Sequence, residues 1–416
     1  MPADVGHLIA ADGLDFQVQT STTRIFSDAD FRAVGATVTD DLSDCDVVLA
    51  IKEIPVEQLR GDTAYLFFSH TVKGQPHSMP LLRRILDTGA TLIDYEPIVD
   101  AAGLRLVHFG RFAGLAGMVD ALVAFGRRWA TQGVQLPFLD LQPAYAYDNL
   151  ADALAAVAAV GRRIATEGLP DAVGPLVIGV TGYGHVGQGV SEVLDRLPRL
   201  DIAPGSLGEA FLAEAESTQV HVAVFTEHDT VARTDGAAFT VADYRADPSA
   251  FVSICASTAR WLSILVNSVL WQPTAPRLLT VEELQVMSDS GWRLDLIADL
   301  SCDIRGGIEA TVRATTSDEP VFVFDPRTGL APAGFTGPGV AILAVDNLPC
   351  EFPLDASVSF SEALRPLIPA IARADFSVPF EALDLPPELK GAVVAHRWSL
   401  TPGFAELDTA LRAAGA

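Results

Sequence analysis

The chain has 416 residues, which exceeds what one hydrophobic core normally supports and predicts two or three domains. Its net charge of −25 argues against a nucleic-acid partner, because phosphate contacts need clustered lysine and arginine, but it leaves a small-molecule substrate open. No apolar run reaches the roughly 18 residues of a membrane span, and the N-terminus lacks a basic segment followed by an apolar one. We therefore expect a cytoplasmic protein with no membrane partner.

Strand-like and helix-like segments alternate over the first 130 residues. Short apolar runs predict strands at 16–20, 46–55, 64–72, 91–99 and 104–110. Amphipathic stretches predict helices at 27–35 and 78–89. Apolar runs bounded by polar turns and separated by such helices favour an α/β fold with a parallel sheet and crossover connections.

The rest of the chain is predicted to form a second α/β lobe and a helical C-terminus. A long helix rich in small residues is expected at 113–133, a proline-containing crossing at 134–149 and a further helix at 150–168. A second alternating series then continues to about residue 350. Roughly the last 60 residues are predicted to be mainly helical, without strands of their own, and to pack back onto an earlier lobe.

The cysteines give no indication of a metal or disulfide site. Cys45, Cys255, Cys302 and Cys350 are far apart in the sequence and form no C-x-x-C pair. We therefore expect reduced, mostly buried thiols and no bound metal.

The segment "VIGVTGYGHVGQG" resembles a dinucleotide-binding fingerprint. An apolar strand runs into Gly182-x-Gly184-x-x-Gly187, and a helical sequence follows. In such a motif Gly182 makes the turn, Gly184 lets the backbone approach a pyrophosphate, and Gly187 allows close packing of helix on strand. The alternative is an ordinary tight turn between a strand and a helix. We predict a cofactor site that also includes His185 and Val186.

The choice between NAD and NADP is left open by the sequence. The acidic residue that contacts the ribose is expected about 20 positions after the fingerprint. Asp201 and Glu209 lie in that region, but so do Arg196 and Arg199, and none of the four stands out.

Ionisable residues follow two successive predicted strands of the first lobe. Lys52 and Glu53 come at the end of "VVLAIKEIP", and His70 and Lys73 come at the end of "YLFFSHTVK". The carboxyl ends of strands are where open α/β sheets bind ligands, and a histidine or a desolvated lysine can exchange protons. The alternatives are a solvated Lys-Glu turn and a capping turn around Ser69.

Further charged residues follow other predicted strands. Asp94 and Glu96 end "TLIDYEPIV", and Arg105 lies in the next apolar run. In the second lobe, "LIADLSCDIRGG" ends in Asp299 and Asp303, which either cap a turn or form a wall of a ligand site.

Several segments together resemble the lysine-2-oxoglutarate reductase family, the saccharopine dehydrogenase (L-lysine-forming) group, which is related in fold to alanine dehydrogenase and transhydrogenase. They are "FFSHTVKGQ", "LIDYEPIVD", "VHFGRFAGLAGMVDAL", "WQPTAPRLLT", "DLSCDIRGGIE" and "VDNLPCEFPLDAS". The resemblance implies two Rossmann-like lobes with parallel sheets flanking a central cleft. It places the substrate lobe at 1–135 plus 355–416 and the dinucleotide-binding lobe at 136–354.

The resemblance also implies a reaction. The ε-amine of L-lysine condenses with the keto carbon of 2-oxoglutarate, and NAD or NADP supplies the hydride that reduces the imine to saccharopine; some members run the reverse. By position, the family's acid-base pair corresponds to Lys52 and His70. Its substrate contacts correspond to Glu53, Lys73, Glu96, Arg105 and Asp303.

The chain departs from the family pattern at its N-terminus. Relatives have an additional strand that carries an arginine of the substrate site, whereas Met1 is followed here by a segment resembling the next helix. Either the given sequence starts after that strand, or the first lobe lacks the strand and its arginine. Two alternatives stay open: another amino-acid dehydrogenase or imine reductase on the same scaffold, and a non-catalytic cofactor-binding homologue. The sequence does not indicate an oligomeric state.

Overall fold

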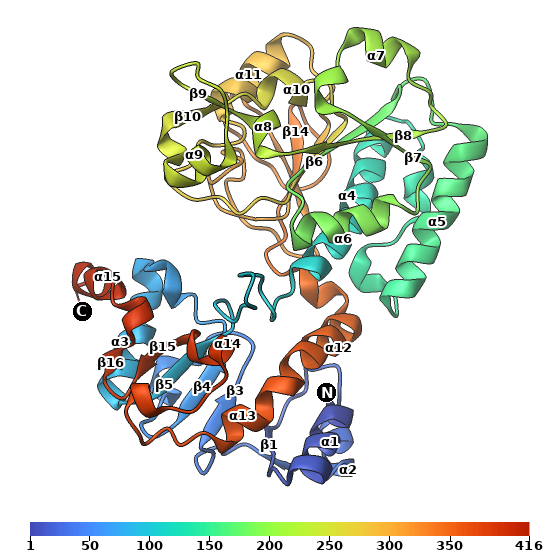
Figure 1. The fold of residues 1–416 in the computed structure, drawn as a ribbon. Helices are drawn as coiled ribbons and strands as arrows, with labels where there is room; N and C mark the ends of the chain where they lie inside the picture. The colour runs from blue at the N-terminus through green and yellow to red at the C-terminus, as the bar shows by residue number, and fades with distance from the viewer. Residues whose placement is uncertain (416) are drawn as a thin grey trace. The chain divides into compact units, whose positions relative to one another are not determined.

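The computed structural model describes residues 1–415, which form two compact units (Figure 1). Unit 1 comprises Met1–His108 and the C-terminal part from Ser357, and unit 2 comprises Phe109–Ala356. Helices and parallel strands occur in both, so the predicted α/β class is confirmed. No helix within residues 1–415 has the length and hydropathy needed to cross a membrane.

Unit 1 is built on a five-stranded sheet in the order β16-β15-β5-β4-β3. The strands of the whole unit are β1 (Gln17–Gln19), β2 (Thr37–Thr39), β3 (Val47–Leu49), β4 (Ala64–Phe67), β5 (Thr91–Asp94), β15 (Val393–His396) and β16 (Ser399–Leu400). Its helices are α1 (Pro2–Asp12), α2 (Asp28–Ala33), α3 (Met79–Thr88), α13 (Ile368–Arg373), α14 (Pro387–Lys390) and α15 (Leu407–Ala413). Strands β3, β4 and β5 are parallel, and β1 and β2 form a separate parallel pair.

The C-terminal segment contributes two strands, where the sequence predicted only helices. Strand β15 is fully buried and pairs antiparallel with both β5 and β16. The preceding helix α14 stops at Lys390, and the apolar residues 392–395 that follow include the β-branched pair Val393 and Val394. A short run of consecutive apolar residues fits a buried strand as well as a helix, so periodicity could not separate the two. The predicted strand at 104–110 is also wrong, because Arg105 makes only an isolated bridge to Val99.

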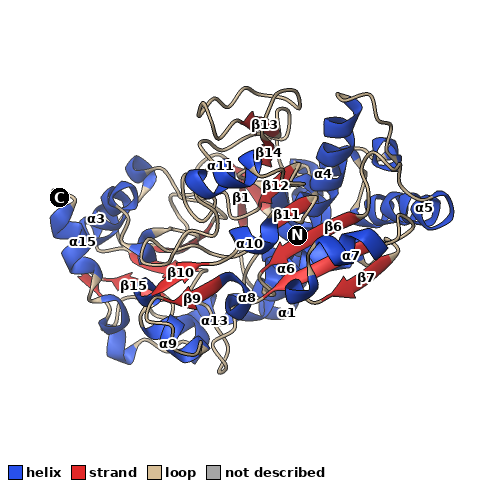
Figure 2. Ribbon diagram, turned by 90° about the horizontal axis from the view of Figure 1, so that it is seen from above, coloured by secondary structure: helices blue, strands red, loops and turns tan. Residues whose placement is uncertain are grey.

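Unit 2 contains a seven-stranded sheet in the order β13-β14-β12-β11-β6-β8-β7, parallel except for β13 (Figure 2). Its strands are β6 (Leu176–Thr181), β7 (Arg199–Ile202), β8 (Val220–Phe225), β11 (Ile264–Asn267), β12 (Leu296–Asp299), β13 (Val321–Phe324) and β14 (Val340–Leu343). Strands β9 (Val231–Arg233) and β10 (Phe251–Ser253) form a separate antiparallel pair. Its helices are α4 (Gly110–Ala130), α5 (Leu150–Glu167), α6 (His185–Leu194), α7 (Glu209–Glu214), α8 (Glu227–Thr230), α9 (Val241–Ala246), α10 (Ala256–Ala259) and α11 (Val281–Asp289). Helix α12 (Pro353–Leu364) begins in unit 2 and continues into unit 1.

Helix α4 belongs to unit 2, whereas the sequence analysis placed it in the first lobe. A Cβ atom on Gly114 would lie 2.0 Å from the carbonyl oxygen of Val186, and one on Gly189 would lie 2.0 Å from that of Arg111. The backbones of α4 and α6 are therefore in direct contact, which only glycine permits at these positions. Close packing against the helix of the fingerprint is the physical reason for the small residues in α4.

Candidate functional site

The ionisable residues predicted for the first lobe follow three adjacent parallel strands of unit 1. Strands β3, β4 and β5 lie side by side, so their carboxyl ends share one edge of the sheet (Figure 1). Lys52 and Glu53 lie in the loop after β3, His70 and Lys73 after β4, and Glu96 after β5. This edge of the sheet is where open α/β folds place ligands.

His70 and Glu53 form a hydrogen-bonded pair that joins the first two loops. The contact runs between His70 Nδ1 and Glu53 Oε1, and both side chains are partly exposed. Partial burial opposes ionisation of Glu53, but the hydrogen bond from His70 and the nearby charge of Lys52 hold its pKa below the usual value. An ionised Glu53 accepts a hydrogen bond from Nδ1–H, so Nε2 is the ring nitrogen that can exchange a proton with a bound molecule.

Glu96 and Arg105 form a second pair at the same edge. Arg105 Nη2 donates to Glu96 Oε1 at 2.5 Å, and the side chain of Glu96 is 12% exposed against 44% for Arg105. A guanidinium has five N–H donors, so Arg105 keeps donors for a carboxylate of a ligand. Lys52 and Lys73 are exposed, and Lys73 ends a short 3-10 turn that starts at Thr71.

The fingerprint of unit 2 has the geometry that a dinucleotide requires. Gly182 follows β6 with φ of 89°, and a Cβ atom on Gly187 would lie 2.5 Å from the carbonyl oxygen of Gly182. Gly184 is the N-cap of α6, and no atom lies within 4 Å of where its Cβ would stand. No side chain caps this helix end, and the start of a helix is where backbone N–H groups bind an anion such as a pyrophosphate. These residues therefore fit the cofactor.

The acidic residue beside the fingerprint is Glu227, which the sequence analysis missed. Strand β8 is the parallel neighbour of β6, and Glu227 comes two residues after its end. The hydroxyl of Tyr183, inside the fingerprint, donates to Glu227 Oε2 at 3.1 Å. Asp201 lies instead in the edge strand β7, where Arg199 Nε donates to it at 2.8 Å.

Glu227 could have been found by following strands rather than by counting residues. The segment containing β7 and α7 is inserted between α6 and β8, so the carboxylate at the end of the neighbouring strand comes later than the usual spacing of about 20. The next strongly apolar strand sequence after the fingerprint, "VHVAVF", ends directly before Thr226 and Glu227.

A buried polar network supports the loops that follow β6, β11 and β12. Asn267 Nδ2 donates to Asp299 Oδ1 at 2.9 Å, and Thr181 Oγ1 donates to Asn267 Oδ1 at 3.1 Å. Burial raises the pKa of Asp299, and the hydrogen bonds it receives oppose that change. Asp303 lies in the loop after β12, so it belongs to unit 2, whereas the other proposed substrate and catalytic residues belong to unit 1.

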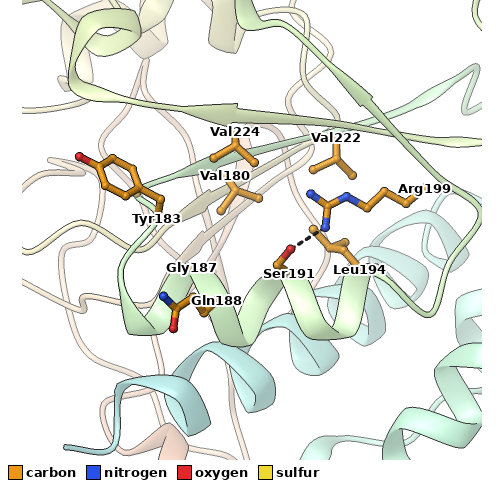
Figure 3. A pocket seen from close by; sticks show the side chains of 10 residues that line it. Val180, Tyr183, Gly187, Gln188, Ser191, Leu194, Arg199, Val222 and Val224 are labelled. Carbon is orange, nitrogen blue, oxygen red and sulfur yellow. Dashed lines mark hydrogen bonds between the residues drawn. The ribbon is translucent and has the colours of Figure 1, made fainter. Parts of the chain in front are cut away.

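A pocket of about 160 Å³ flanks the fingerprint helix (Figure 3). Val180, Val222 and Val224 line it from the sheet, and Ser191 and Arg199 lie at its polar end. Arg199 Nη1 donates to Ser191 Oγ at 2.6 Å and to the carboxylate of Asp195 at 2.7 Å. Its donors are thus engaged within the protein, and the pocket offers an apolar slot rather than an anion site. Within residues 1–415, no group of three or more His, Cys, Asp or Glu side chains is placed to hold a metal ion.

Two models of one known family match separate stretches of the chain. The model of the alanine dehydrogenase/PNT N-terminal domain matches residues 1–116, and that of the alanine dehydrogenase/PNT C-terminal domain matches residues 255–401. The chain belongs to the alanine dehydrogenase/PNT family. Two solved structures share the fold at 17% identity: an L-alanine dehydrogenase, with a TM-score of 0.61 over 99% of this chain and 95% of that one, and a transhydrogenase from Sinorhizobium meliloti, with 0.55 over 96% and 95%.

Curated relatives confirm the resemblance inferred from the motifs. The chain is 39% identical over 396 residues to the alpha-aminoadipic semialdehyde synthase of Arabidopsis thaliana, covering 92% of this chain and 37% of that protein. The mitochondrial alpha-aminoadipic semialdehyde synthase of Rattus norvegicus is 30% identical over 94% of this chain and 44% of its own length. The saccharopine dehydrogenase [NAD(+), L-lysine-forming] of Neurospora crassa is 27% identical over 88% and 85%. The chain thus spans less than half the length of the two synthases. Its cytoplasmic location stays a prediction.

Proposed function

We propose that the chain is a nicotinamide-dependent oxidoreductase of the saccharopine type. It condenses L-lysine with 2-oxoglutarate and reduces the resulting imine to saccharopine, or it runs the reverse reaction. The observation that carries this proposal is the His70–Glu53 pair beside Lys52, at the edge of a sheet that also presents Glu96 and Arg105. A relative named as an L-lysine-forming saccharopine dehydrogenase aligns over 88% of the chain and supports the same proposal.

The proposed chemistry needs groups that move protons. The ε-ammonium of free lysine has a pKa near 10.4, so it must lose a proton before it attacks a carbonyl, and the carbinolamine must then lose water. His70 can take up and return protons at Nε2, because Glu53 holds Nδ1. Lys52 lies in the same loop as Glu53 and is the second group proposed to exchange protons with the substrate nitrogen or oxygen.

The charges at this edge match those of the proposed substrates. Arg105 and Lys73 can bind the carboxylates of 2-oxoglutarate and of the amino acid, and Arg105 is already oriented by Glu96. Glu96 can in turn hold an ammonium group. Asp303 is proposed as a further substrate-binding residue because it occupies the position of one in the family pattern.

The cofactor is proposed to bind unit 2. The N–H groups at the start of α6 would hold its pyrophosphate where Gly184 leaves room, with Gly182 and Gly187 shaping the turn and His185 and Val186 completing the binding segment. When bound, the nicotinamide supplies or accepts the hydride. Glu227 would accept hydrogen bonds from the ribose hydroxyls, and its negative charge would repel a 2′-phosphate. We therefore propose NAD rather than NADP.

Replacing Glu227 tests this cofactor preference. The Glu227→Gln variant is expected to bind NADH about tenfold more weakly, because a charge-assisted hydrogen bond to the ribose is lost. The difference between its dissociation constants for NADH and NADPH should also become smaller, because the charge that repels a 2′-phosphate is lost. Fluorescence titration with each nucleotide measures the two dissociation constants. Asp201→Asn is the matched control and should leave both constants unchanged. A weaker NADH affinity in the control, with Glu227→Gln unaffected, would contradict the assignment.

The substrates are tested by nicotinamide oxidation. L-lysine with 2-oxoglutarate should support turnover, and ornithine with 2-oxoglutarate or ammonia with pyruvate should not. Turnover only with another pair would place the chain among other imine-reducing dehydrogenases. Tight nucleotide binding without turnover on any pair would favour the non-catalytic alternative.

A further inference from the structure

Asp94 is the last residue of β5 and carries a buried carboxyl group. Its side chain is fully buried. One oxygen, Oδ2, accepts hydrogen bonds from the backbone N–H of Ser69 at 3.0 Å and from the Ser69 hydroxyl. The other oxygen, Oδ1, accepts the backbone N–H of Glu96 at 2.7 Å. Three donors from two different loops therefore converge on one carboxyl.

The first of these loops carries His70. The Ser69 hydroxyl, which donates to Asp94, also receives the N–H of Thr71 at 3.2 Å and contacts the Thr71 hydroxyl at 2.7 Å. Ser69 and Thr71 are fully buried and flank His70 on both sides. His70 itself has φ of 53°, a left-handed conformation that costs free energy for a residue with a side chain. The buried hydrogen bonds on either side are what hold the backbone of His70 in this conformation.

The second loop carries Glu96. The backbone N–H of Glu96 donates a hydrogen bond to Asp94, and the side chain of Glu96 accepts one from Arg105. The direction in which Glu96 leaves the strand, and with it the position of the Arg105 guanidinium, therefore depends on the same carboxyl. Asp94 touches neither the imidazole nor the guanidinium, so any effect on them must pass through the backbone.

We propose that Asp94 is a positioning residue that fixes the His70 turn and the Glu96 loop relative to each other. In its catalytic consequence this rests on the proposed function, because it makes His70 and Arg105 act on one bound substrate. The carboxyl group suits the task, since an ionised aspartate only accepts hydrogen bonds and all its partners here are donors. Burial raises the pKa of Asp94, and the hydrogen bonds from Ser69 and Glu96 oppose that rise.

The near-isosteric variant Asp94→Asn separates this role from simple filling of space. An asparagine presents one acceptor oxygen and one NH₂ group, so one of the two loops would meet a donor instead of an acceptor. Turnover number is expected to fall about ten- to a hundredfold, because small misplacements of reacting groups have effects of this size. The dissociation constant for NADH, which depends on unit 2, should stay within about twofold.

Thr91→Val is the matched control. Thr91 begins the same strand and its hydroxyl hydrogen-bonds to His396 Nδ1 at 2.8 Å in the buried interior. This variant also removes a buried hydrogen bond from β5, but at the end away from His70 and Glu96. It should lower the thermal midpoint about as much as Asp94→Asn and keep wild-type turnover. Equal losses of turnover in the two variants would reduce Asp94 to a general stabiliser and overturn the proposal.

A double variant tests whether Asp94 acts through His70. Adding Asp94→Asn to His70→Gln should lower turnover by a clearly smaller factor than adding it to the wild type, because the turn then no longer carries the imidazole that exchanges protons. If Asp94→Asn acted only by reducing the fraction of folded protein, it would lower turnover by the same factor in the wild type and in His70→Gln. Full multiplication of the two factors, or wild-type turnover in Asp94→Asn, would overturn the proposal.

Hydrogen exchange measured by mass spectrometry tests the positioning without any substrate. In Asp94→Asn, the peptides covering 68–75 and 95–106 should both exchange faster, whereas the peptide covering 181–194 should be unchanged. If the wild type turns over none of the proposed substrate pairs, the proposed function fails, but faster exchange in both loops still supports the positioning role. Faster exchange in one loop only, or in neither, overturns it.

Discussion

Lys52→Met and His70→Gln should each lower turnover of L-lysine with 2-oxoglutarate about 10²- to 10⁴-fold, the range that general acid-base groups contribute. Each change removes a group that can exchange protons and keeps a side chain of similar length. The dissociation constant for NADH should change little, because the fingerprint lies in unit 2. Steady-state kinetics together with a nucleotide titration measure both quantities.

Matched controls exist within the same unit for both variants. His77 is an exposed histidine seven residues after His70, and Lys390 hydrogen-bonds to the carbonyl oxygens of Glu381 and Leu383. His77→Gln and Lys390→Met should keep wild-type turnover. Should either site variant keep it as well, the role assigned to that residue is wrong. Loss of activity in the controls would point to a general effect on folding.

The local features of the fold could be predicted from the sequence. The strand, glycine turn and helix around Gly182 and Gly187 depend on residues that are close in the sequence, and the structure has the predicted order of elements. The proximity of the loops that carry His70 and Glu53 could be predicted, but the hydrogen bond between these two side chains could not. Successive strands that pair in parallel bring their carboxyl ends together, but nothing in the sequence showed which side chain of each loop would meet the other.

Features that depend on partners distant in the sequence could not be predicted. Strand β15 is a strand because it pairs with β5, which lies about 300 residues earlier, and its own short apolar run does not distinguish a strand from the helix that was predicted. Helix α4 belongs to unit 2 because its glycines meet the backbone of α6, and glycine spacing alone does not name the partner. Glu227 was missed because an inserted strand and helix lengthen the path from the fingerprint to the neighbouring strand.

Alanine substitutions at Gly189 and Gly184 are expected to affect different properties: the first should lower stability, and the second should weaken cofactor binding. Gly189 is inside α6, where alanine would normally stabilise a helix by about 1 kcal/mol. A Cβ there would lie 2.0 Å from the backbone of α4, so Gly189→Ala should instead lower the urea midpoint of unfolding. Gly184, at the N-cap of the same helix, has open space around its Cβ position and an ordinary φ of −73°.

Gly184→Ala is therefore expected to fold normally and to lose the cofactor. Its methyl group would stand where the backbone must approach the pyrophosphate, and a steric cost of about 1–3 kcal/mol corresponds to a roughly 5- to 150-fold weaker affinity for NADH. Gly205→Ala is the control, because Gly205 is another glycine of unit 2 with open space around its Cβ position. Unchanged urea midpoints in both variants, with loss of NADH binding only in Gly184→Ala, would place the pyrophosphate at the start of α6. Wild-type NADH affinity in Gly184→Ala would show that the nucleotide, if it binds at all, does so elsewhere.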